Sequence, residues 1–174
     1  MPSERETLLL SWLEQHRGIV YRLARAYTVT PEDRADLIQE MSAQLWRSIP
    51  GFKQQCQPVT WVYRVCLNTA LGWRRDFTTR NRALPVAAES TDAAVSSEPH
   101  PRSDHEHTEL LARLYESIRT LPKFERSVVL LHLEGLSYRE IHETLGISEN
   151  HIGVLLTRAR QKLGAKMKEV RNEL

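Results

Sequence analysis

The chain of 174 residues is long enough for one ordinary domain or two small helical ones, and it needs no disulfide framework to bury a core. Hydrophobic residues make up 41% and charged residues 26%, a globular composition that excludes a disordered chain. No apolar run approaches the roughly 18 residues of a membrane helix, and the polar N-terminus is no signal peptide. With only two cysteines, Cys56 and Cys66, we expect a reduced, cytoplasmic protein without a zinc site of four ligands.

The net charge of +2 is small, but the charges are unevenly distributed along the chain. Residues 150–174 hold 6 Lys and Arg against 2 Asp and Glu, in a segment with helical spacing. A basic helix in a nearly neutral protein indicates contact with a polyanion. A solvated C-terminal helix, whose cations complement the helix dipole, fits this pattern equally well.

Residues 1–82 are expected to form a small all-α domain, a bundle of three or four helices, because apolar residues recur at helical spacing. One apolar stripe extends over Leu9–Tyr27. Thr30 and Pro31 then supply a helix cap and a first-turn proline for a second helix, which ends near Pro50-Gly51.

Pro58 begins a third long helix in this first domain. Its apolar stripe includes Cys66 and Trp73, so we expect Cys66 to be a buried, unreactive thiol and Trp73 to belong to the core. Trp61 fits a core position and a base-stacking position equally well. Arg74 and Arg75 lie near the end of the same helix.

Residues 83–104 differ from both flanks, because they hold three prolines, several serines and alanines, and almost no large side chain. This composition predicts a flexible linker between two helical domains. His100, His105 and His107 lie in or beside it without a cysteine or an organised acid, so we expect solvated histidines rather than metal ligands.

Residues 105–174 are expected to form the second helical domain. Apolar residues at helical spacing predict one helix before Pro122 and a short one after it, and Glu134-Gly135-Leu136 turns the chain. Ser137 and Glu140 have the spacing of a capping box at the start of the next helix.

A tight turn and a longer helix follow this capped helix. Gly146 lies where a helix C-terminus favours a left-handed residue, and Ser148 caps a helix that continues to about Lys168. This arrangement is typical of a helix-turn-helix. A helical hairpin without a DNA-binding role is the alternative, but the two caps and the glycine favour DNA binding. The residues expected to face outward on the second helix are Asn150, His151, Val154, Thr157, Arg158 and Gln161.

Both halves of the chain resemble a known family. The second half contains Leu121-Pro122, Glu134-Gly135-Leu136-Ser137-Tyr138-Arg139-Glu140-Ile141, Leu145-Gly146-Ile147-Ser148 and Arg158-Ala159-Arg160-Gln161-Lys162-Leu163, and it is similar to region 4 of the extracytoplasmic-function (group 4) sigma factors of bacterial RNA polymerase. The first half contains Asp36-Leu37-Ile38-Gln39-Glu40, Trp46-Arg47, Gly51-Phe52, Thr60-Trp61-Val62-Tyr63-Arg64-Val65 and Asn68-Thr69-Ala70, and it resembles region 2 of that family. The resemblance covers residues 6–80 and 106–168, in the family's order around a linker.

This resemblance implies a transcription initiation factor with region 2 at 1–82 and region 4 at 105–174. The implied partners are core RNA polymerase, through the clamp helices of its largest subunit and the flap of its second-largest subunit, promoter DNA, and an anti-sigma factor. The implied contacts with the clamp helices are Asp36, Leu37, Gln39, Glu40 and Ala43. The residues implied in recognition and melting of the −10 element are Gln54, Gln55, Thr60, Trp61, Arg64, Asn68, Arg74 and Arg75. Those implied in binding the −35 element are Tyr138, Arg139, Ser148, Asn150, His151, Val154, Thr157, Arg158 and Arg160.

The chain departs from the family pattern at two places in region 4. Gly153, Val154 and Leu155 occupy positions where the family often has basic or small polar residues, so phosphate contacts are lost there. His142 replaces an alanine at a crowded helix crossing, and we expect it to tilt outward or to accept a local hydrogen bond.

Two other classes of protein were considered. A helix-turn-helix regulator with an N-terminal sensor is the alternative, but residues 1–80 show no receiver pattern of strands and acidic residues. An enzyme would need a metal-ligand pair, a nucleophile motif or a phosphate-binding glycine loop, and the sequence has none of these. We therefore expect no enzymatic activity, no cofactor, no metal and no small-molecule substrate, and no membrane insertion of the chain itself.

Overall fold

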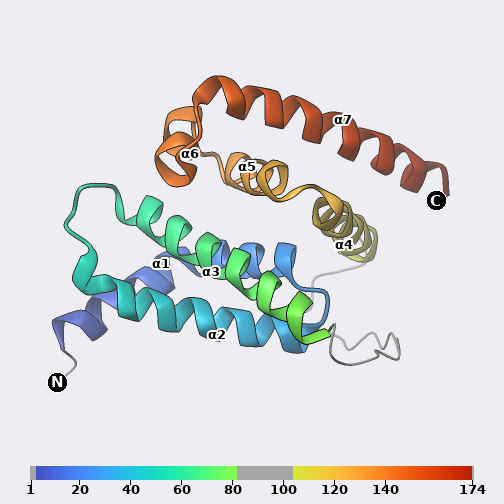
Figure 1. Cartoon of the computed structure of the whole chain (residues 1–174). Coiled ribbons are helices and arrows are strands. Elements are labelled where there is room, and N and C mark those ends of the chain that lie inside the picture. The colour runs from blue at the N-terminus through green and yellow to red at the C-terminus, as the bar shows by residue number, and fades with distance from the viewer. Residues whose placement is uncertain (1–2, 82–103, 174) are drawn as a thin grey trace. The chain divides into compact units, whose positions relative to one another are not determined.

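The computed structural model describes residues 3–81 and 104–173, which belong to two compact units divided near residue 96 (Figure 1). The described residues form seven α-helices and one 3-10 turn, with no strand among them. This confirms the expected all-α class. None of these helices is both long enough and apolar enough to cross a bilayer.

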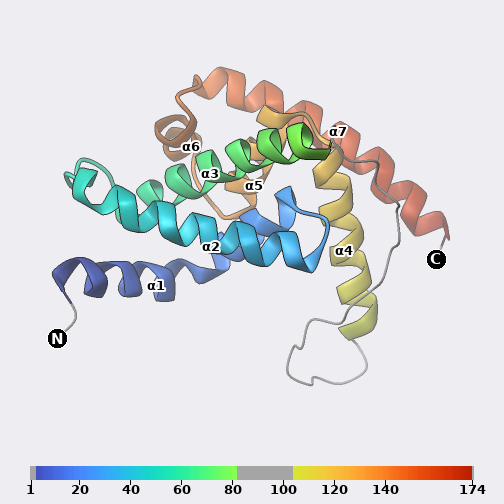
Figure 2. The same cartoon turned by 60° about the horizontal axis from the view of Figure 1, so that its bottom comes forward.

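The first unit is a bundle of three long helices. These are α1 (Glu4–Tyr27), α2 (Pro31–Ser48) and α3 (Pro58–Asn81), with the 3-10 turn η1 (Ile49–Gly51) directly after α2. Each helix packs against the other two, and Figures 1 and 2 both show them side by side. The largest fully buried side chains of this unit are those of Leu23, Leu37, Met41, Leu45, Val62, Tyr63 and Leu67.

Local signals in the sequence account for where these helices begin. The Ser3 side chain accepts a hydrogen bond from the backbone N–H of Glu6, and the Glu6 carboxylate accepts one from the backbone of Ser3, which forms a capping box. The Thr30 hydroxyl oxygen accepts from the backbone N–H of Asp33 at 3.1 Å, and Pro31 is the first residue of α2, as expected.

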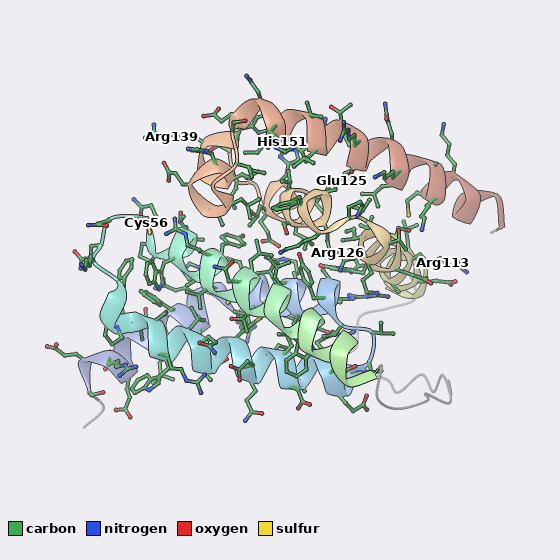
Figure 3. The ribbon with its side chains drawn as sticks, in the orientation of Figure 1. Cys56, Arg113, Glu125, Arg126, Arg139 and His151 are labelled. Carbon is green, nitrogen blue, oxygen red and sulfur yellow. The ribbon has the colours of Figure 1, made fainter. Side chains whose placement is uncertain are left out.

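The second unit contains α4 (Asp104–Thr120), α5 (Lys123–Leu133), α6 (Tyr138–Leu145) and α7 (Glu149–Glu173). The long helix α7 packs against the other three. Arg126, labelled in Figure 3, is buried on α5 and donates to the backbone carbonyls of Arg119 and Leu121, where α4 ends. Buried apolar side chains from all four helices form the core: Tyr115, Ile118, Leu121, Val128, Leu131, Ile141, Ile152, Leu156 and Ala159.

The expected linker, residues 83–104, lies outside the described residues except for Asp104, which begins α4. His100 also lies outside them. Cys66 is buried in the first unit, and this burial raises the pKa of its thiol to about 12. A thiol with that pKa is protonated at neutral pH, so the expectation of an unreactive cysteine is confirmed.

Candidate functional site

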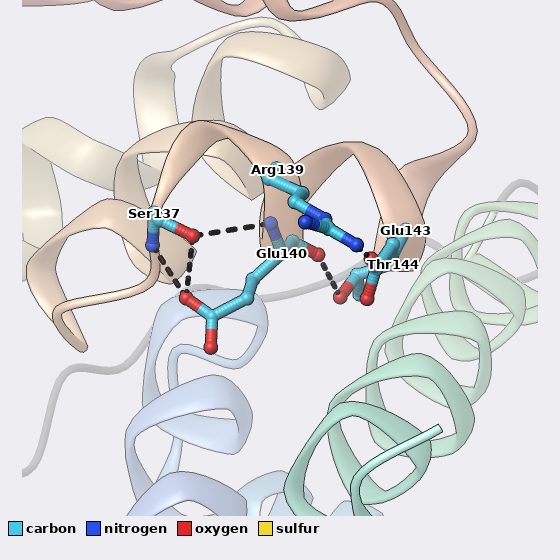
Figure 4. A network of polar contacts seen from close by, with 5 residues as sticks. All are labelled: Ser137, Arg139, Glu140, Glu143 and Thr144. Atoms are coloured by element: carbon cyan, nitrogen blue, oxygen red, sulfur yellow. Dashed lines mark hydrogen bonds and ion pairs between the residues drawn. The ribbon is translucent and has the colours of Figure 1, made fainter. Parts of the chain in front are cut away.

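Contacts between neighbouring residues fix both ends of α6, the helix that a short turn joins to α7. The Ser137 hydroxyl oxygen accepts from the backbone N–H of Glu140 at 3.3 Å, and the Glu140 carboxylate accepts from the Ser137 hydroxyl and backbone N–H at 2.7 and 2.8 Å (Figure 4). Both hydrogen bonds lower the pKa of Glu140, and the bond from the Ser137 hydroxyl has the larger effect. At the other end of α6, Gly146 has φ of 71°, the left-handed conformation predicted for it.

His142 lies beside this turn and points into solvent. Its Nδ1 is 2.8 Å from the carbonyl oxygen of Ile147, and a carbonyl only accepts, so the ring donates this hydrogen bond. The first of the two alternatives expected for His142, an outward tilt, is therefore confirmed, and the local hydrogen bond that it makes is donated by Nδ1. This hydrogen bond from His142 to Ile147 is a further contact that stabilises the turn between α6 and α7.

The first turns of α7 present one face to the core and the other to solvent. Ile152, Leu155 and Leu156 are buried, with exposed fractions of 6% or less. The residues that the sequence placed on the outward face are all exposed: Asn150, His151, Val154, Thr157, Arg158 and Gln161. Leu155 is one of the three positions at which the sequence predicts a loss of phosphate contacts, and its burial agrees with that prediction. Ser148, also exposed, lies just before α7, and its hydroxyl oxygen accepts from the backbone N–H of His151 at 3.4 Å.

Two expected DNA-binding residues lie at the start of α6. Tyr138 is exposed, and its ring lies against α7, because a Cβ built on Gly153 would be 3.7 Å from its Cε2. The Arg139 side chain is 81% exposed and forms an ion pair with Glu143 at 3.3 Å (Figures 3 and 4).

The basic C-terminal helix is partly used within its own unit. The Lys162 ammonium group contacts both carboxylate oxygens of Glu125, at 2.8 and 2.9 Å, and that carboxylate is only 7% exposed on α5. Lys166 donates to the Thr120 hydroxyl oxygen at 2.8 Å. Arg160, which was expected to bind DNA, lies 3.2 Å from the His132 ring nitrogen Nε2. The sequence offered two interpretations of this helix, contact with a polyanion or simple solvation. Neither describes α7 fully, because Arg160, Lys162 and Lys166 contact residues of α4 and α5.

On α2, four of the five residues expected to contact the polymerase retain some exposure. Asp36 and Gln39 are exposed, and Glu40 and Ala43 are half-buried. The Glu40 carboxylate accepts hydrogen bonds from the Gln44 amide at 2.8 Å and the Arg47 guanidinium at 3.3 Å. The fifth residue, Leu37, is fully buried in the helical core, so its expected contact with a partner is wrong.

The loop between η1 and α3 is held by an aromatic cluster. Phe52 packs edge-on against Trp12, with ring centroids 5.0 Å apart, and Trp61 packs against Phe52 at 5.5 Å. The Trp61 indole N–H also donates to the Ser48 hydroxyl oxygen at 3.0 Å. Trp61 is thus a half-buried part of the packing that holds this loop, and its expected stacking on a base stays a prediction. Gln54 and Gln55 are exposed at the tip, whereas Thr60 is 3% exposed, too buried for the expected DNA contact.

An open pocket of about 620 Å³ lies between α2 and α3. Asn68, exposed as the sequence predicted, lines it. Trp73 is half-buried at its wall instead of in the core. The residues that line the pocket are Glu40, Gln44, Arg47, Ser48, Val65, Asn68, Thr69, Gly72 and Trp73.

The sequence did not indicate the contribution of α2 to this pocket. Ser48 and Gln44 are ordinary helix residues, and only the packing of α2 against α3 brings them beside Asn68. Of the remaining candidates on α3, Arg64 is half-buried, and the side chains of Arg74 and Arg75 lie outside the described residues.

Comparison with known proteins places both units in one family. The family model described as Sigma-70 region 2 matches residues 12–80, and the model described as Sigma-70, region 4 matches residues 111–163. The ECF RNA polymerase sigma factor SigE of Mycolicibacterium smegmatis is 36% identical over 161 residues, which cover 88% of this chain. The chain spans 60% of the length of that relative.

Two further proteins show the same likeness. The ECF RNA polymerase sigma-E factor of Haemophilus influenzae is 27% identical over 148 residues, covering 80% of this chain and 77% of its own. The sigma factor RpoE of Bartonella quintana, solved in complex with the anti-sigma factor NepR, has a similar fold with a TM-score of 0.66 at 16% identity, over 90% of this chain and 94% of its own. With both sigma-70 regions matched in order and the helix-turn-helix formed as expected, the chain belongs to the sigma-70 family, among the extracytoplasmic-function sigma factors of RNA polymerase.

Proposed function

We propose that this chain binds core RNA polymerase, directs it to promoters with particular −10 and −35 elements, and helps to separate the DNA strands. The observation that carries the proposal is the exposed polar face of α7 directly after a fixed turn, in one chain with a region 2 bundle. Phosphodiester chemistry would belong to the polymerase, so the chain itself acts as a specificity factor and not as an enzyme. It would work in the cytoplasm, where polymerase and chromosome are.

The second unit is suited to the −35 element as duplex DNA. A helix that follows a tight turn enters the major groove with its N-terminal residues. Asn150 and His151 would contact base edges there, and Arg158, two turns further along, would contact a base or a phosphate. Tyr138 and Arg139 at the start of α6, with Ser148, Thr157 and Arg160, complete this surface, in which Arg160 is also held by His132.

The first unit is suited to the polymerase and to single-stranded DNA. Asp36, Gln39, Glu40 and Ala43 would face the clamp helices, because an acidic and amide surface complements a basic coiled coil. Asn68 would bind an extruded base in the pocket between α2 and α3, since an amide can pair with a base edge. The exposed Gln54 and Gln55 would border the displaced strand, and Arg64, Arg74 and Arg75 would hold its phosphates.

Regulation by an anti-sigma factor is part of the proposal. The structurally similar RpoE of Bartonella quintana was solved with the anti-sigma factor NepR. We infer that a helical inhibitor covers the DNA-binding and core-binding surfaces of this chain. The flap of the second-largest subunit would contact the second unit in the absence of the inhibitor.

The test is association with purified core polymerase, followed by run-off transcription on a promoter library. The double variant Asp36→Arg with Glu40→Arg should lose co-elution with core, because it reverses the charge of the proposed surface while both positions lie outside the hydrophobic core. The double variant Glu14→Arg with Glu116→Arg makes the same charge change at exposed positions on α1 and α4 and should co-elute normally. Equal co-elution of both variants would refute the α2 assignment, and failure of the wild-type chain to direct any transcript would refute the function.

A further inference from the structure

An exposed apolar side chain lies in the middle of the polar face of α7. Val154 is 46% exposed, although valine gains free energy by burial. Four residues before it and four after it are the exposed Asn150 and Arg158, which lie on the same side of the helix. Val154 is therefore at the centre of the surface of α7 that would face the major groove. The inference rests on the promoter recognition proposed above.

Thr157 adds a second methyl group beside Val154. Its hydroxyl donates to the backbone carbonyl of Gly153 at 2.9 Å, so its proton is used within the helix. Thr157 is itself exposed, and three residues' spacing places it next to Val154 on the helix surface. What Thr157 offers to a base at this position is its methyl group, together with an oxygen that can only accept.

The ring of Tyr138 on α6 lies beside the residue that precedes Val154. A Cβ built on Gly153 would be 3.7 Å from the ring atom Cε2. The surface around Val154 thus has an aromatic ring nearby. Its polar neighbours are Asn150 toward the helix N-terminus and Arg158 toward the C-terminus.

We propose that Val154 and Thr157 recognise a thymine of the −35 element through its C5 methyl group. Among the four standard bases only thymine carries a methyl group in the major groove, and apolar side chains and threonine methyl groups are its usual partners. A cytosine at this position would carry no methyl group to fill the contact with Val154. Val154 is thereby a specificity-determining residue. An apolar side chain in place of a cation at this position exchanges a phosphate contact for selection of thymine.

The test uses deoxyuridine, which differs from thymidine only in lacking this methyl group. Holoenzyme reconstituted from core polymerase and the full chain selects duplexes from a library randomised in the −35 element. Each thymine of the selected element is then replaced in turn by deoxyuridine, and dissociation constants are measured by fluorescence anisotropy. We expect one thymine whose replacement weakens wild-type binding about fourfold, the effect of burying one methyl group.

The variants locate the effect at Val154. Val154→Ala should bind the thymine duplex about fourfold more weakly and should distinguish it from the deoxyuridine duplex much less than the wild type does, because only the Thr157 methyl group remains in the contact, whereas Val154→Ile should keep the discrimination. Leu133→Ala is the matched control, because it truncates another exposed apolar side chain, 61% exposed on α5, and should leave the discrimination unchanged. If the wild type binds thymine and deoxyuridine equally at every position, or if Val154→Ala keeps full discrimination, the proposal is overturned while promoter recognition stands. If no duplex is selected at all, promoter recognition fails and the proposal fails with it.

Discussion

The two candidate DNA-binding regions are stabilised in opposite ways. Helix α6 and the turn that follows it are fixed by contacts over three to five residues, such as Ser137 with Glu140 at the start of the helix and His142 with Ile147 in the turn. The loop between η1 and α3 is fixed by rings from distant parts of the chain, because Trp12 on α1 supports Phe52. The turn between α6 and α7 therefore depends mainly on its own residues. The loop between η1 and α3 depends on the packing of the whole three-helix bundle. A turn with fixed local geometry suits binding to duplex DNA. A loop held by the packing of the bundle suits a role in strand opening.

The largest expected effect comes from Trp61, which joins the loop to the bundle. Trp61→Ala removes a ring that packs on Phe52 at 5.5 Å and the hydrogen bond to Ser48. We expect the first unit to lose about 2–4 kcal/mol of stability, less than for a fully buried tryptophan. Trp61→Phe keeps a ring and loses only the hydrogen bond, about 1 kcal/mol. Hydrogen exchange of the full chain should show faster exchange in the first unit and unchanged exchange in the second unit; equal destabilisation by both variants would mean that the ring packing contributes nothing.

The next effect concerns Lys162, a cation of α7 that serves the fold. Lys162→Met leaves the nearly buried Glu125 carboxylate without its ammonium partner, which should cost about 1–3 kcal/mol because Lys162 is itself half exposed. Urea unfolding measures this loss, and Lys162→Met with Glu125→Gln should recover part of it. The salt dependence of DNA binding should be unchanged, whereas a flatter dependence would assign Lys162 to phosphate binding.

Gly146 tests whether the turn between α6 and α7 is a local structure. Gly146→Ala should destabilise the second unit by about 1 kcal/mol, because its φ of 71° is unfavourable for a residue with a Cβ. The matched variant Gly164→Ala lies inside α7, where a Cβ meets nothing within 4 Å, and it should stabilise the helix by up to about 1 kcal/mol. Thermal unfolding monitored by circular dichroism distinguishes the two signs. A shift of the same sign for both glycines would show that the turn is not held as described.

The smallest effect is a pH dependence of the capping box. The hydrogen bonds from Ser137 lower the pKa of Glu140 in the folded chain, so this stabilisation is complete above the usual carboxyl pKa and is lost as the pH falls through the folded pKa. Glu140 is close to solvent, so the gain should stay below about 1 kcal/mol. The stability difference between the wild type and Glu140→Gln should shrink as the pH is lowered from 7 to 3; a difference that grows would contradict the stated direction.

The same contrast explains what the sequence predicted and what it did not. Ser137, Gly146 and Thr30 act on residues within a few positions, so their residue types alone indicate caps and turns. The buried Leu37 and Thr60 were placed at binding surfaces because they lie in family motifs, although a motif does not show which of its side chains face the core.

Contacts between distant residues were the part that the sequence could not supply. Trp61 joins Ser48 across 13 positions, and Lys162 joins Glu125 across 37. No periodicity encodes such pairs, because they arise only when one helix packs on another. The pocket beside Asn68 was missed in part for this reason, since half of its wall comes from α2.

The most direct test of the division between the two units is transcription from two templates, fully duplex DNA and DNA already melted at the −10 element. Run-off transcription with holoenzyme would compare Asn68→Ala in the first unit with Arg158→Ala in the second. We expect Asn68→Ala to lose most activity on the duplex and to recover much of it on the melted template, because part of its role is to capture an extruded base. Arg158→Ala should lose about the same on both templates, because its contact is with duplex DNA upstream. Equal losses for Asn68→Ala on the two templates would contradict the division of function between the two units.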